Sequence, residues 1–392
     1  MRHEGGATSR APYREGHPRF RFVHHGWLGG LTMVTGRRLG RGLAVVVVAL
    51  VLASCGTSAP LWVPRLTWQE VRLPLNPPGR YEPAMAYDAA TNQVVLFGGA
   101  RDITFHLLGD TWTWNGTTWT EQHPAQSPPP MYGSKMAYDA ATHQLVLFGG
   151  GVSKKLPSHH PSNMPIPARG VTNTWTWNGN TWAELHPKVS PPPLMLGVDM
   201  VYDAATREIV LLTNGPFPYR TTETWTWNGT TWTEQHPPVS PPDISYVGGH
   251  FTMAYDSATR QVVLYDNVYI PRRPHIIDET WTWNGVIWTE QHPPVSPTFR
   301  EGGTLVETPS PGILMLTGGA IEGNPKNPRI WFWNGRTWYG VAPPRTGLPS
   351  PIYATYDDAS RTIVIQEDYL TSTGTMMAHT WLVKLAAGAS RQ

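Results

Sequence analysis

The sequence predicts an all-β fold, a closed ring of six similar four-stranded sheets, and three observations support this prediction. A segment of about fifty residues recurs six times along the chain. Its copies are short apolar or aromatic runs separated by turn residues, and Gly and Pro (38 and 39 residues) make up roughly a fifth of the 392 residues. Outside the N-terminal region, no long stretch has the apolar spacing of an α-helix.

The first two strands of each repeat follow from one recurring word. Its fullest copy is MAYDAATNQVVLFGG at 85–99, with related copies at 136–150, 200–214, 253–267, 305–319 and 354–368. Met-Ala-Tyr-Asp ends the first strand, and Asp-Ala-Ala-Thr predicts a turn because Asp and Thr side chains bond nearby backbone groups. The run Val-Val-Leu-Phe predicts a second strand that is buried on both faces and ends at Gly98-Gly99.

The third and fourth strands follow from TWTWNGTTWTEQHP at 111–124, which returns at 174–187, 224–237 and 280–293. Asn115-Gly116 predicts a two-residue type I′ turn. In that register Trp114 faces Thr117 and Trp112 faces Trp119, and strand alternation places the three tryptophans on one face. We expect a neighbouring sheet to cover this aromatic face; the alternative is that it is exposed and stacks on sugars.

The spacing of the tryptophans sets the number of units. The tryptophans that head equivalent segments are separated by 63, 50, 56, 50 and 50 residues: Trp112, Trp175, Trp225, Trp281, Trp331 and Trp381. Four-stranded sheets repeated at this period predict a six-bladed β-propeller. The order of an apolar strand ending in Gly-Gly, an aromatic strand and a tryptophan after a short turn resembles the kelch repeat, over about residues 68–384. The resemblance implies a kelch-type propeller of the galactose oxidase central-domain superfamily.

The two ends of the predicted propeller complement each other. Residues 67–71 match the fourth strand at 118–122 but have no third strand ahead of them, and residues 379–385 form a third strand without a fourth. We therefore expect the N-terminal strand to close the last blade. The predicted propeller covers 67–385, and 386–392 form a tail.

The N-terminal segment predicts export and lipid attachment. Residues 1–54 carry eight Arg, no Lys and two Glu, whereas residues 55–392 have a net charge of −4, so nucleic acid is not an expected partner. Three arginines precede the apolar run 43–53, as in a secretory signal at 33–54. The last four residues up to Cys55, the only cysteine, resemble the lipobox of bacterial lipoproteins. This resemblance implies a lipidated Cys55, a linker at 55–66 and a cell-membrane location on the extracytoplasmic side; residues 1–32 are expected to be an over-extended start.

Candidate ligand-binding residues stand just before the predicted first strands, at the mouth of the central channel. They are polar and differ between repeats, as expected for a pocket on a repeated frame. The alternative is a solvated rim. The candidates are Arg80, Tyr81, Glu82, Tyr132, Lys135, Asp199, His250, Arg300 and Glu301.

Catalytic motifs are missing from the sequence. The copper and Tyr–Cys chemistry of galactose oxidase is excluded because Cys55 lies outside the propeller, and no Gly-x-Ser-x-Gly, His-Glu-x-x-His or Cys-x-x-Cys occurs. We therefore expect a monomeric binding module without metal or cofactor, whose partner is an envelope protein or a glycan. The alternative is a carbohydrate-active hydrolase or epimerase with its site in the central funnel.

Overall fold

The structure is a computed structural model, and the chain divides into the units Met1–Ala59 and Pro60–Gln392. All described residues belong to the second unit, so Cys55 and the signal segment lie outside them. Within the described residues, no helix is long and apolar enough to cross a membrane. The structure describes residues 65–102, 106–152, 170–193, 199–214, 222–242, 250–269, 276–297, 303–309, 312–317, 330–341, 352–370 and 376–386.

The described strands form six four-stranded antiparallel sheets, here called blades 1 to 6. Blade 1 contains β2 (Ala84–Asp88), β3 (Gln93–Phe97), β4 (Thr111–Trp114) and β5 (Trp119–Gln122). Blade 2 contains β6 (Lys135–Asp139), β7 (Gln144–Phe148), β8 (Thr174–Trp177) and β9 (Trp182–Leu185). Blade 3 contains β10 (Asp199–Asp203), β11 (Glu208–Asn214), β12 (Thr222–Trp227) and β13 (Trp232–Gln235). Blade 4 contains β14 (His250–Asp256), β15 (Gln261–Tyr269), β16 (Ile276–Trp283) and β17 (Trp288–Gln291). Blade 5 contains β18 (Gly303–Thr308), β19 (Gly312–Thr317), β20 (Ile330–Trp333) and β21 (Trp338–Val341). Blade 6 contains β22 (Ile352–Asp357), β23 (Thr362–Leu370), β24 (Met376–Ala386) and β1 (Arg65–Val71).

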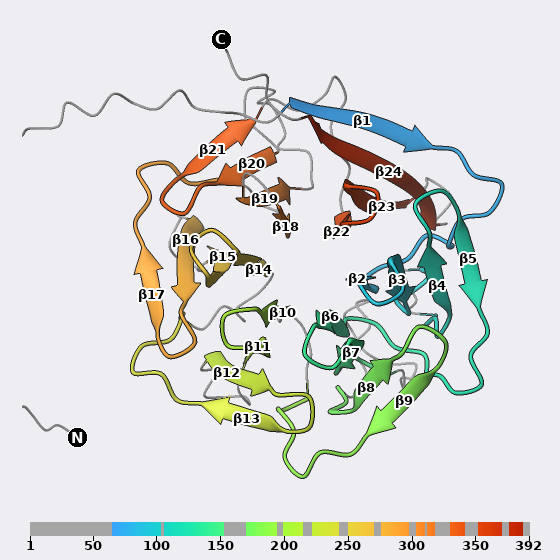
Figure 1. Ribbon diagram of the computed structural model, residues 1–392, viewed down its shortest axis with the longest axis horizontal. Helices are drawn as coiled ribbons and strands as arrows, with labels where there is room; N and C mark the ends of the chain where they lie inside the picture. Colours follow the sequence, from blue (N-terminus) through green and yellow to red (C-terminus); the bar gives the residue numbers. More distant parts are fainter. Residues whose placement is uncertain are drawn as a thin grey trace, which may run out of the picture. The chain divides into compact units, whose positions relative to one another are not determined.

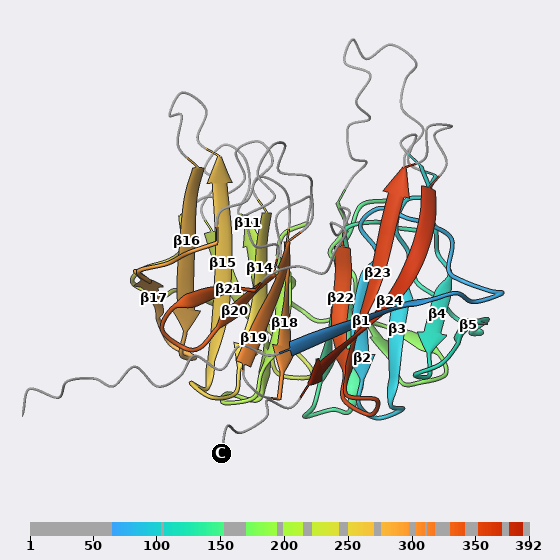
Figure 2. The same ribbon diagram turned by 90° about the horizontal axis from the view of Figure 1, so that it is seen from above.

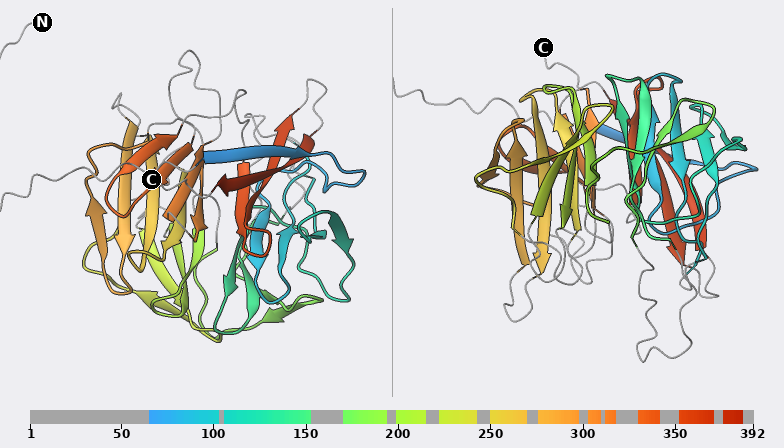
Figure 3. Two further views of the ribbon diagram at one scale, coloured as in Figure 1. Left: turned by 45° about the horizontal axis from the view of Figure 1, so that its top comes forward. Right: turned by 90° about the horizontal axis from the view of Figure 1, so that it is seen from below.

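The six blades form a closed ring around a central channel (Figure 1). The first strand of each blade is innermost, and each innermost strand contacts those of the blades on both sides. We call the side where the first strands begin the loop face and the side where they end the turn face. The long strands β15, β16, β23 and β24 reach furthest toward the loop face (Figures 2 and 3). The predicted all-β, six-bladed propeller is confirmed.

Blade 6 is assembled from both ends of the propeller. The first strand of the chain, β1, pairs antiparallel with the last, β24, from Arg65 opposite Ala386 to Val71 opposite Thr380. This confirms the prediction that the N-terminal strand closes the last blade. The pairing also fixes polarity, because Ala386 lies at the turn-face end of β24 and β1 therefore begins on the turn face.

The hairpin between the third and fourth strands differs from the predicted two-residue turn. Trp114 pairs directly with Trp119, so four residues connect the strands, and the predicted pairing of Trp112 with Trp119 is wrong. The side-chain oxygen of Asn115 accepts hydrogen bonds from the backbone N–H groups of Thr117 and Thr118 at 3.0 and 2.9 Å. This Asx-type bonding stabilises a longer loop, in which Gly116 has a positive φ of 93°.

The aromatic face is buried between blades, as expected. In blades 1 to 5 the tryptophan that begins the fourth strand has at most 3% of its surface exposed. Its indole N–H donates to the hydroxyl of a buried threonine in the preceding blade at 2.8–2.9 Å. These bonds join Trp119 to Thr380, Trp182 to Thr111, Trp232 to Thr174, Trp288 to Thr224 and Trp338 to Thr280. The tryptophans therefore pack the blades together rather than forming an exposed sugar-binding array.

The interface between blades 5 and 6 lacks this bond. The residue of blade 5 at the threonine position is Ile330, which has no hydroxyl group. Trp68 of β1, the corresponding tryptophan, is only partly buried and packs against an aliphatic cluster that includes Ile330, Leu316 and Val383. At this position apolar contact takes the place of the tryptophan–threonine hydrogen bond.

The turns at the turn face also join neighbouring blades. The carboxylate of Asp88 accepts bonds from the Ala90 N–H at 3.0 Å and the Thr91 hydroxyl at 2.8 Å, as the Asp-Ala-Ala-Thr word predicts. Gly179 of the next hairpin lies directly on this turn: a Cβ there would stand 2.5 Å from Thr91 Cγ2, and its φ is +92°. Glycine is required at this position both by the backbone conformation and by the close approach.

We expect Thr224→Val to lower the free energy of unfolding by about 1–3 kcal/mol, because it leaves the buried Trp288 indole N–H without its acceptor while keeping the side-chain shape. Urea unfolding followed by tryptophan fluorescence measures the change. The matched control is Thr233→Val on the neighbouring β13, whose side chain is exposed and whose loss should change stability by less than about 0.5 kcal/mol. Equal effects of the two substitutions would contradict the role of the bond.

Candidate functional site

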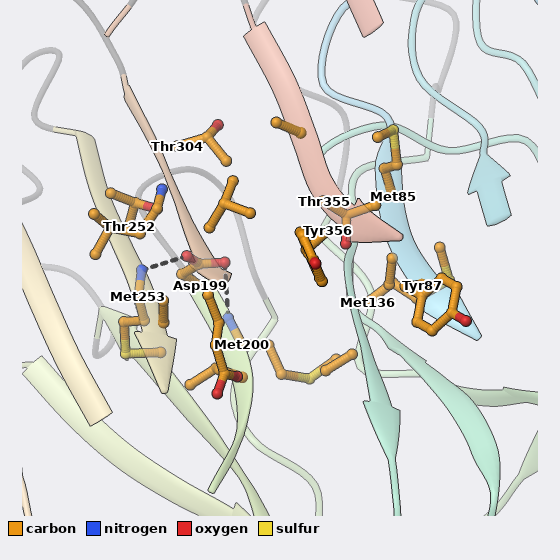
Figure 4. Close-up of a pocket in the computed structure, with 18 of the residues that line it drawn as sticks. Met85, Tyr87, Met136, Asp199, Met200, Thr252, Met253, Thr304, Thr355 and Tyr356 are labelled. Carbon is orange, nitrogen blue, oxygen red and sulfur yellow. Dashed lines mark hydrogen bonds between the residues drawn. The ribbon is translucent and has the colours of Figure 1, made fainter. Parts of the chain in front are cut away.

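A cavity of about 860 Å³ follows the central channel. Residues of all six innermost strands line it, from Glu82 and Ser134 at the loop face to the turn residues Ser257 and Asp358 at the turn face. Figure 4 shows part of this lining, with side chains converging from several strands. The cavity is thus enclosed by the ring itself.

The repeat arranges the lining in levels along the channel. Nearest the loop face is a level of variable residues, here called the mouth ring: Ala84, Lys135, Asp199, Thr252, Thr304 and Tyr353. Two levels of small or apolar residues follow, here called the apolar section: Met85, Ala86, Met136, Ala137, Met200, Val201, Met253, Ala254, Leu305, Val306, Ala354 and Thr355. The level nearest the turn face, here called the tyrosine ring, comprises Tyr87, Tyr138, Tyr202, Tyr255, Glu307 and Tyr356.

Several mouth-ring side chains are committed to joining blades. The carboxylate of Asp199 accepts bonds from the backbone N–H groups of Met200 at 2.9 Å and Met253 at 2.7 Å (Figure 4). The Thr252 hydroxyl accepts a bond from the Leu305 N–H at 2.8 Å. Innermost strands have an open edge whose N–H groups need acceptors, and these side chains supply them.

Glu82 and Lys135 differ from these residues because their charged groups do not bond to the neighbouring strands. Both line the cavity, on neighbouring blades, and neither charged group makes a hydrogen bond or ion pair with any residue that the structure describes. Lys135 is the only cationic residue in the described cavity lining. Among the described residues of the mouth, Lys135 and Glu82 thus offer a charged donor and a charged acceptor without hydrogen-bond or ion-pair partners, and the Lys135 charge also acts on Asp199.

The backbone of Glu82 is held in a strained conformation. Its φ is +49°, and it lies outside the repeated turns between first and second strands (Asp-x-x-Thr, or Asp-x-x-Ser in blade 6), where the other described non-glycine residues with positive φ occur. Its N–H donates to the Tyr353 hydroxyl of blade 6 at 2.7 Å, and its carbonyl accepts from the Gly133 N–H of blade 2 at 2.8 Å. Such strain persists where the surroundings enforce it, and it is common at binding sites.

Burial governs the titration of the mouth. It raises the pKa of Asp199, although the Lys135 charge and the two backbone N–H groups oppose the rise. It also raises the pKa of Tyr353 well above its ordinary value, and Glu82 adds to that effect. Tyr353 therefore keeps its proton across the physiological range and presents a neutral hydroxyl next to Glu82.

Glu307 interrupts the tyrosine ring, because the other five blades have tyrosine at this position. Water reaches its side chain, yet the surrounding protein and the neighbouring Asp256 raise the pKa of Glu307 to about 7. The turn-face end of the channel thus holds a carboxyl group that is half protonated near neutral pH.

The predicted site residues fall into three groups according to where the structure places them. Glu82, Lys135 and Asp199 line the cavity. The side chain of His250 and all of Arg300 and Glu301 lie outside the described residues. Arg80, Tyr81 and Tyr132 are described but are not part of the cavity lining: Tyr81 and Tyr132 form backbone bridges with Ala100 and Gly151.

Arg80 was predicted at the channel mouth but is fully buried. Its guanidinium binds both carboxylate oxygens of Asp110 at 2.8 Å and also the Gly98 carbonyl at 2.8 Å. Burial alone would raise the pKa of Asp110, but the hydrogen bonds and charge of Arg80 outweigh it and lower the pKa. The arginine fixes the entry into blade 1 and has no free donor group directed into the channel.

Sequence reasoning missed Tyr353 and Glu307. Aligning the six copies of the Met-Ala-Tyr-Asp word would have shown that Glu307 replaces a tyrosine, and that Tyr353 precedes the word as Lys135 and Asp199 do. Over the described residues, no group of three or more His, Cys, Asp or Glu side chains is placed to hold a metal ion.

We expect stability to fall as the pH rises from about 4 to about 8. Burial raises the pKa of Asp368 to about 8 despite the charge of Arg80, and that of Glu307 to about 7, from ordinary values of 3.8 and 4.5. Both acids therefore bind protons more tightly in the folded than in the unfolded chain, so folding is favoured at low pH and this advantage is lost by pH 8. Asp110 has a lowered pKa in the folded chain, so its ionised form stabilises the fold, and this contribution is lost only below about pH 4.

The melting temperature across this pH range tests the expectation. Asp368→Asn removes a buried carboxylate whose ionisation opposes folding at pH 8. It should therefore raise the melting temperature at pH 8 by roughly 2 °C for each kcal/mol gained in the free energy of unfolding, and should make the melting temperature less dependent on pH in the upper part of the range. Glu307→Gln should make the melting temperature less dependent on pH below pH 7. A profile that is unchanged by both substitutions would contradict the raised pKa values.

Comparisons with known proteins find similarity in fold. No protein-family model matches the chain, and no curated protein matches its sequence. A protein of unknown function from Dyadobacter fermentans is 12% identical and superposes with a TM-score of 0.52, over 83% of this chain and all of that one. A Trypanosoma rangeli sialidase gives 10% identity and a TM-score of 0.47 over 82% of this chain, which spans 60% of the sialidase. The Aleuria aurantia lectin is 12% identical and superposes with a TM-score of 0.45, over 80% of this chain and all of the lectin. At these identities the similarity concerns the propeller fold alone.

Proposed function

We propose that this protein is a binding module that holds a glycan at the loop-face mouth of its central channel. The observation that carries the proposal is the pair of uncommitted, oppositely charged side chains, Glu82 and Lys135, on neighbouring blades of one cavity. A sugar hydroxyl both donates and accepts hydrogen bonds, so adjacent hydroxyls can donate to the carboxylate and accept from the ammonium group. The neutral Tyr353 hydroxyl beside Glu82 adds a third polar contact.

The committed residues around the pair support this assignment. Asp199 and Thr252 already use their oxygens to join blades, so the mouth is rigid before any ligand binds. A preorganised site loses less entropy on binding. The strained backbone of Glu82 is consistent with a side chain that is positioned for a ligand rather than for packing.

The kelch assignment is part of the proposal. It is supported by the glycine pairs that end the second strands of blades 1 and 2, Gly98-Gly99 and Gly149-Gly150, all four of which have positive φ. These residues turn the chain sharply as it leaves the second strand. The proposal is that the whole ring is a kelch-type propeller in which this turn has diverged in the later blades.

We propose that lipid on Cys55 anchors the propeller to the cell membrane on the extracytoplasmic side. The support is the lipobox-like segment up to Cys55 and the polarity of β1, which begins at Arg65 on the turn face. The ten residues from Cys55 to Arg65 span at most about 35 Å.

We expect Glu82→Gln and Lys135→Met each to weaken glycan binding by about tenfold or more, because each removes a charged hydrogen-bond partner. Glycans that raise the melting temperature of the purified full-length chain are first identified in a thermal-shift screen, and their dissociation constants are then measured by isothermal titration calorimetry. The matched control is Asp358→Asn, which removes a lining acid at the opposite end of the channel and should leave affinity unchanged.

The outcomes separate the candidate functions. A glycan whose affinity is insensitive to both mouth substitutions would contradict the proposed site. Turnover of the glycan, abolished by Glu307→Gln, would favour the carbohydrate-active enzyme instead, with Glu307 as the proton donor. The absence of any glycan effect would favour a protein partner.

We expect Cys55→Ala to release the chain from membranes, because the lipid would have no attachment site. Fractionation of expressing cells measures the distribution, and a conservative control is Ser54→Ala, which leaves the cysteine in place. Membrane attachment of the Cys55→Ala chain after signal cleavage would contradict the lipid anchor.

A further inference from the structure

The innermost strands present backbone N–H groups beside the mouth ring, and blade 2 differs from blades 3 to 5 in how this group is used. At equivalent positions, the N–H groups of Met200, Met253 and Leu305 each donate to a side chain of the mouth ring. Met136 is the equivalent residue of β6, which pairs with β7 in the same register. Its N–H group therefore also points away from the second strand of its blade.

The Met136 N–H group lacks an acceptor because the mouth-ring residue of blade 1 is Ala84, and it makes no hydrogen bond with any residue that the structure describes. In blades 3 and 4, Asp199 and Thr252 supply the oxygen that the following blade needs (Figure 4). The Ser134 hydroxyl also has no partner among the described residues, although this side chain is only 1% exposed. Buried polar groups are normally hydrogen-bonded, so these two favour a partner from outside the chain.

These groups bound a space that we call the notch, formed by Glu82 and Ala84 of blade 1 and by Ser134 and Met136 of blade 2. All four residues line the cavity. The two sides are in contact, because the Glu82 carbonyl accepts a hydrogen bond from the Gly133 N–H at 2.8 Å. Blade 1 offers an acceptor, the Glu82 carboxylate, and blade 2 offers two donors. The notch therefore suits a group that donates toward one blade and accepts from the other.

We propose that the notch binds the acetamido group of an N-acetylated sugar, within the glycan site of the proposed function, on which this inference rests. A trans amide directs its N–H and C=O in opposite directions. The N–H donates to Glu82, and the carbonyl oxygen, with two lone pairs, accepts from the Met136 N–H and the Ser134 hydroxyl.

Other sugar substituents fit the notch less well. A carboxylate would be repelled by Glu82, and an ammonium group has no lone pair for the Met136 N–H. A hydroxyl offers one oxygen to both blades, whereas an amide has its donor and its acceptor on separate atoms. The acetamido group is therefore the substituent that matches both sides of the notch.

Lys135 remains available for the sugar hydroxyls. Its side chain alternates with that of Met136 along β6, so the two point to opposite faces of the strand. The Lys135 charge accordingly acts on Asp199 of blade 3, where it opposes the rise in the pKa of that carboxyl. The sugar would thus extend from the notch between blades 1 and 2 toward blade 3.

Matched sugar pairs test the inference. The probes are glucose and N-acetylglucosamine, galactose and N-acetylgalactosamine, and mannose and N-acetylmannosamine, with affinity for the full-length chain measured by calorimetry. We expect the N-acetylated member of at least one pair to bind about tenfold tighter than its parent, from its additional hydrogen bonds. Equal affinities within every pair would overturn the inference but retain the glycan site. Absence of binding by all these sugars would overturn both.

Ala84→Thr tests the place of the acetamido group, because it copies the mouth-ring residue of blade 4 into blade 1. The new hydroxyl should accept the Met136 N–H as Thr252 accepts the Leu305 N–H at 2.8 Å. It should fill the notch and reduce the tenfold preference to less than about twofold. The melting temperature, measured in parallel, should not fall. Preference is a ratio of two affinities, so a general loss of binding does not imitate this result.

Ser134→Ala is a second variant that adds no atoms, and it keeps the test valid if Ala84→Thr does not fold. Loss of one donor should lower the preference by about threefold. The matched control is Thr304→Val, which changes a mouth-ring residue of blade 5 and should leave the preference unchanged. If Ser134→Ala retains the full preference, or if Thr304→Val removes it, the acetamido group binds outside the notch and the inference fails.

Discussion

The hydrogen bond from a buried tryptophan of one blade to a buried threonine of the preceding blade is the interaction on which the ring depends. It occurs at five successive interfaces, each time from the first residue of a fourth strand to a threonine of the third strand in the preceding blade. A buried indole N–H without an acceptor costs about 1–3 kcal/mol, so the bond favours one relative position of two sheets that apolar contact alone would hold less specifically. The repeated Trp and Thr positions are therefore explained together.

The frame determines what the channel can do. Each innermost strand has an open edge, and where Asp199 and Thr252 supply acceptors to the next blade, they leave the mouth rigid. Residues at repeated positions hold the ring, while residues that depart from the repeat, such as Lys135 and Glu307, give the channel distinct ends. The two ends of the channel therefore differ in the charged groups that they offer.

The fold was largely predictable because the same pattern of strands and turns occurs in six copies of the repeat. The strand order, the closing role of β1 and the Asp-x-x-Thr turns all follow from aligned copies. The hairpin register did not, because the Asn115 side chain stabilises a longer loop that the Asn-Gly pair alone does not reveal. Of the candidate residues, Glu82, Lys135 and Asp199 line the cavity, and their role as a site stays a prediction. Arg80 was misplaced because its partner Asp110 is 30 residues away and nothing in the sequence marks the pair as buried.

Hydrogen exchange of the wild-type chain, resolved by strand, measures whether the tryptophan–threonine bonds hold the ring together. The interface between blades 5 and 6 has Ile330 in place of the threonine, so it should open before the others. Amides of β22 and β23 should exchange through an opening of lower free energy than those of the equivalent β10 and β11. Equal protection in the two blades, or earlier opening of blade 3, would show that the tryptophan–threonine bonds do not hold the ring together.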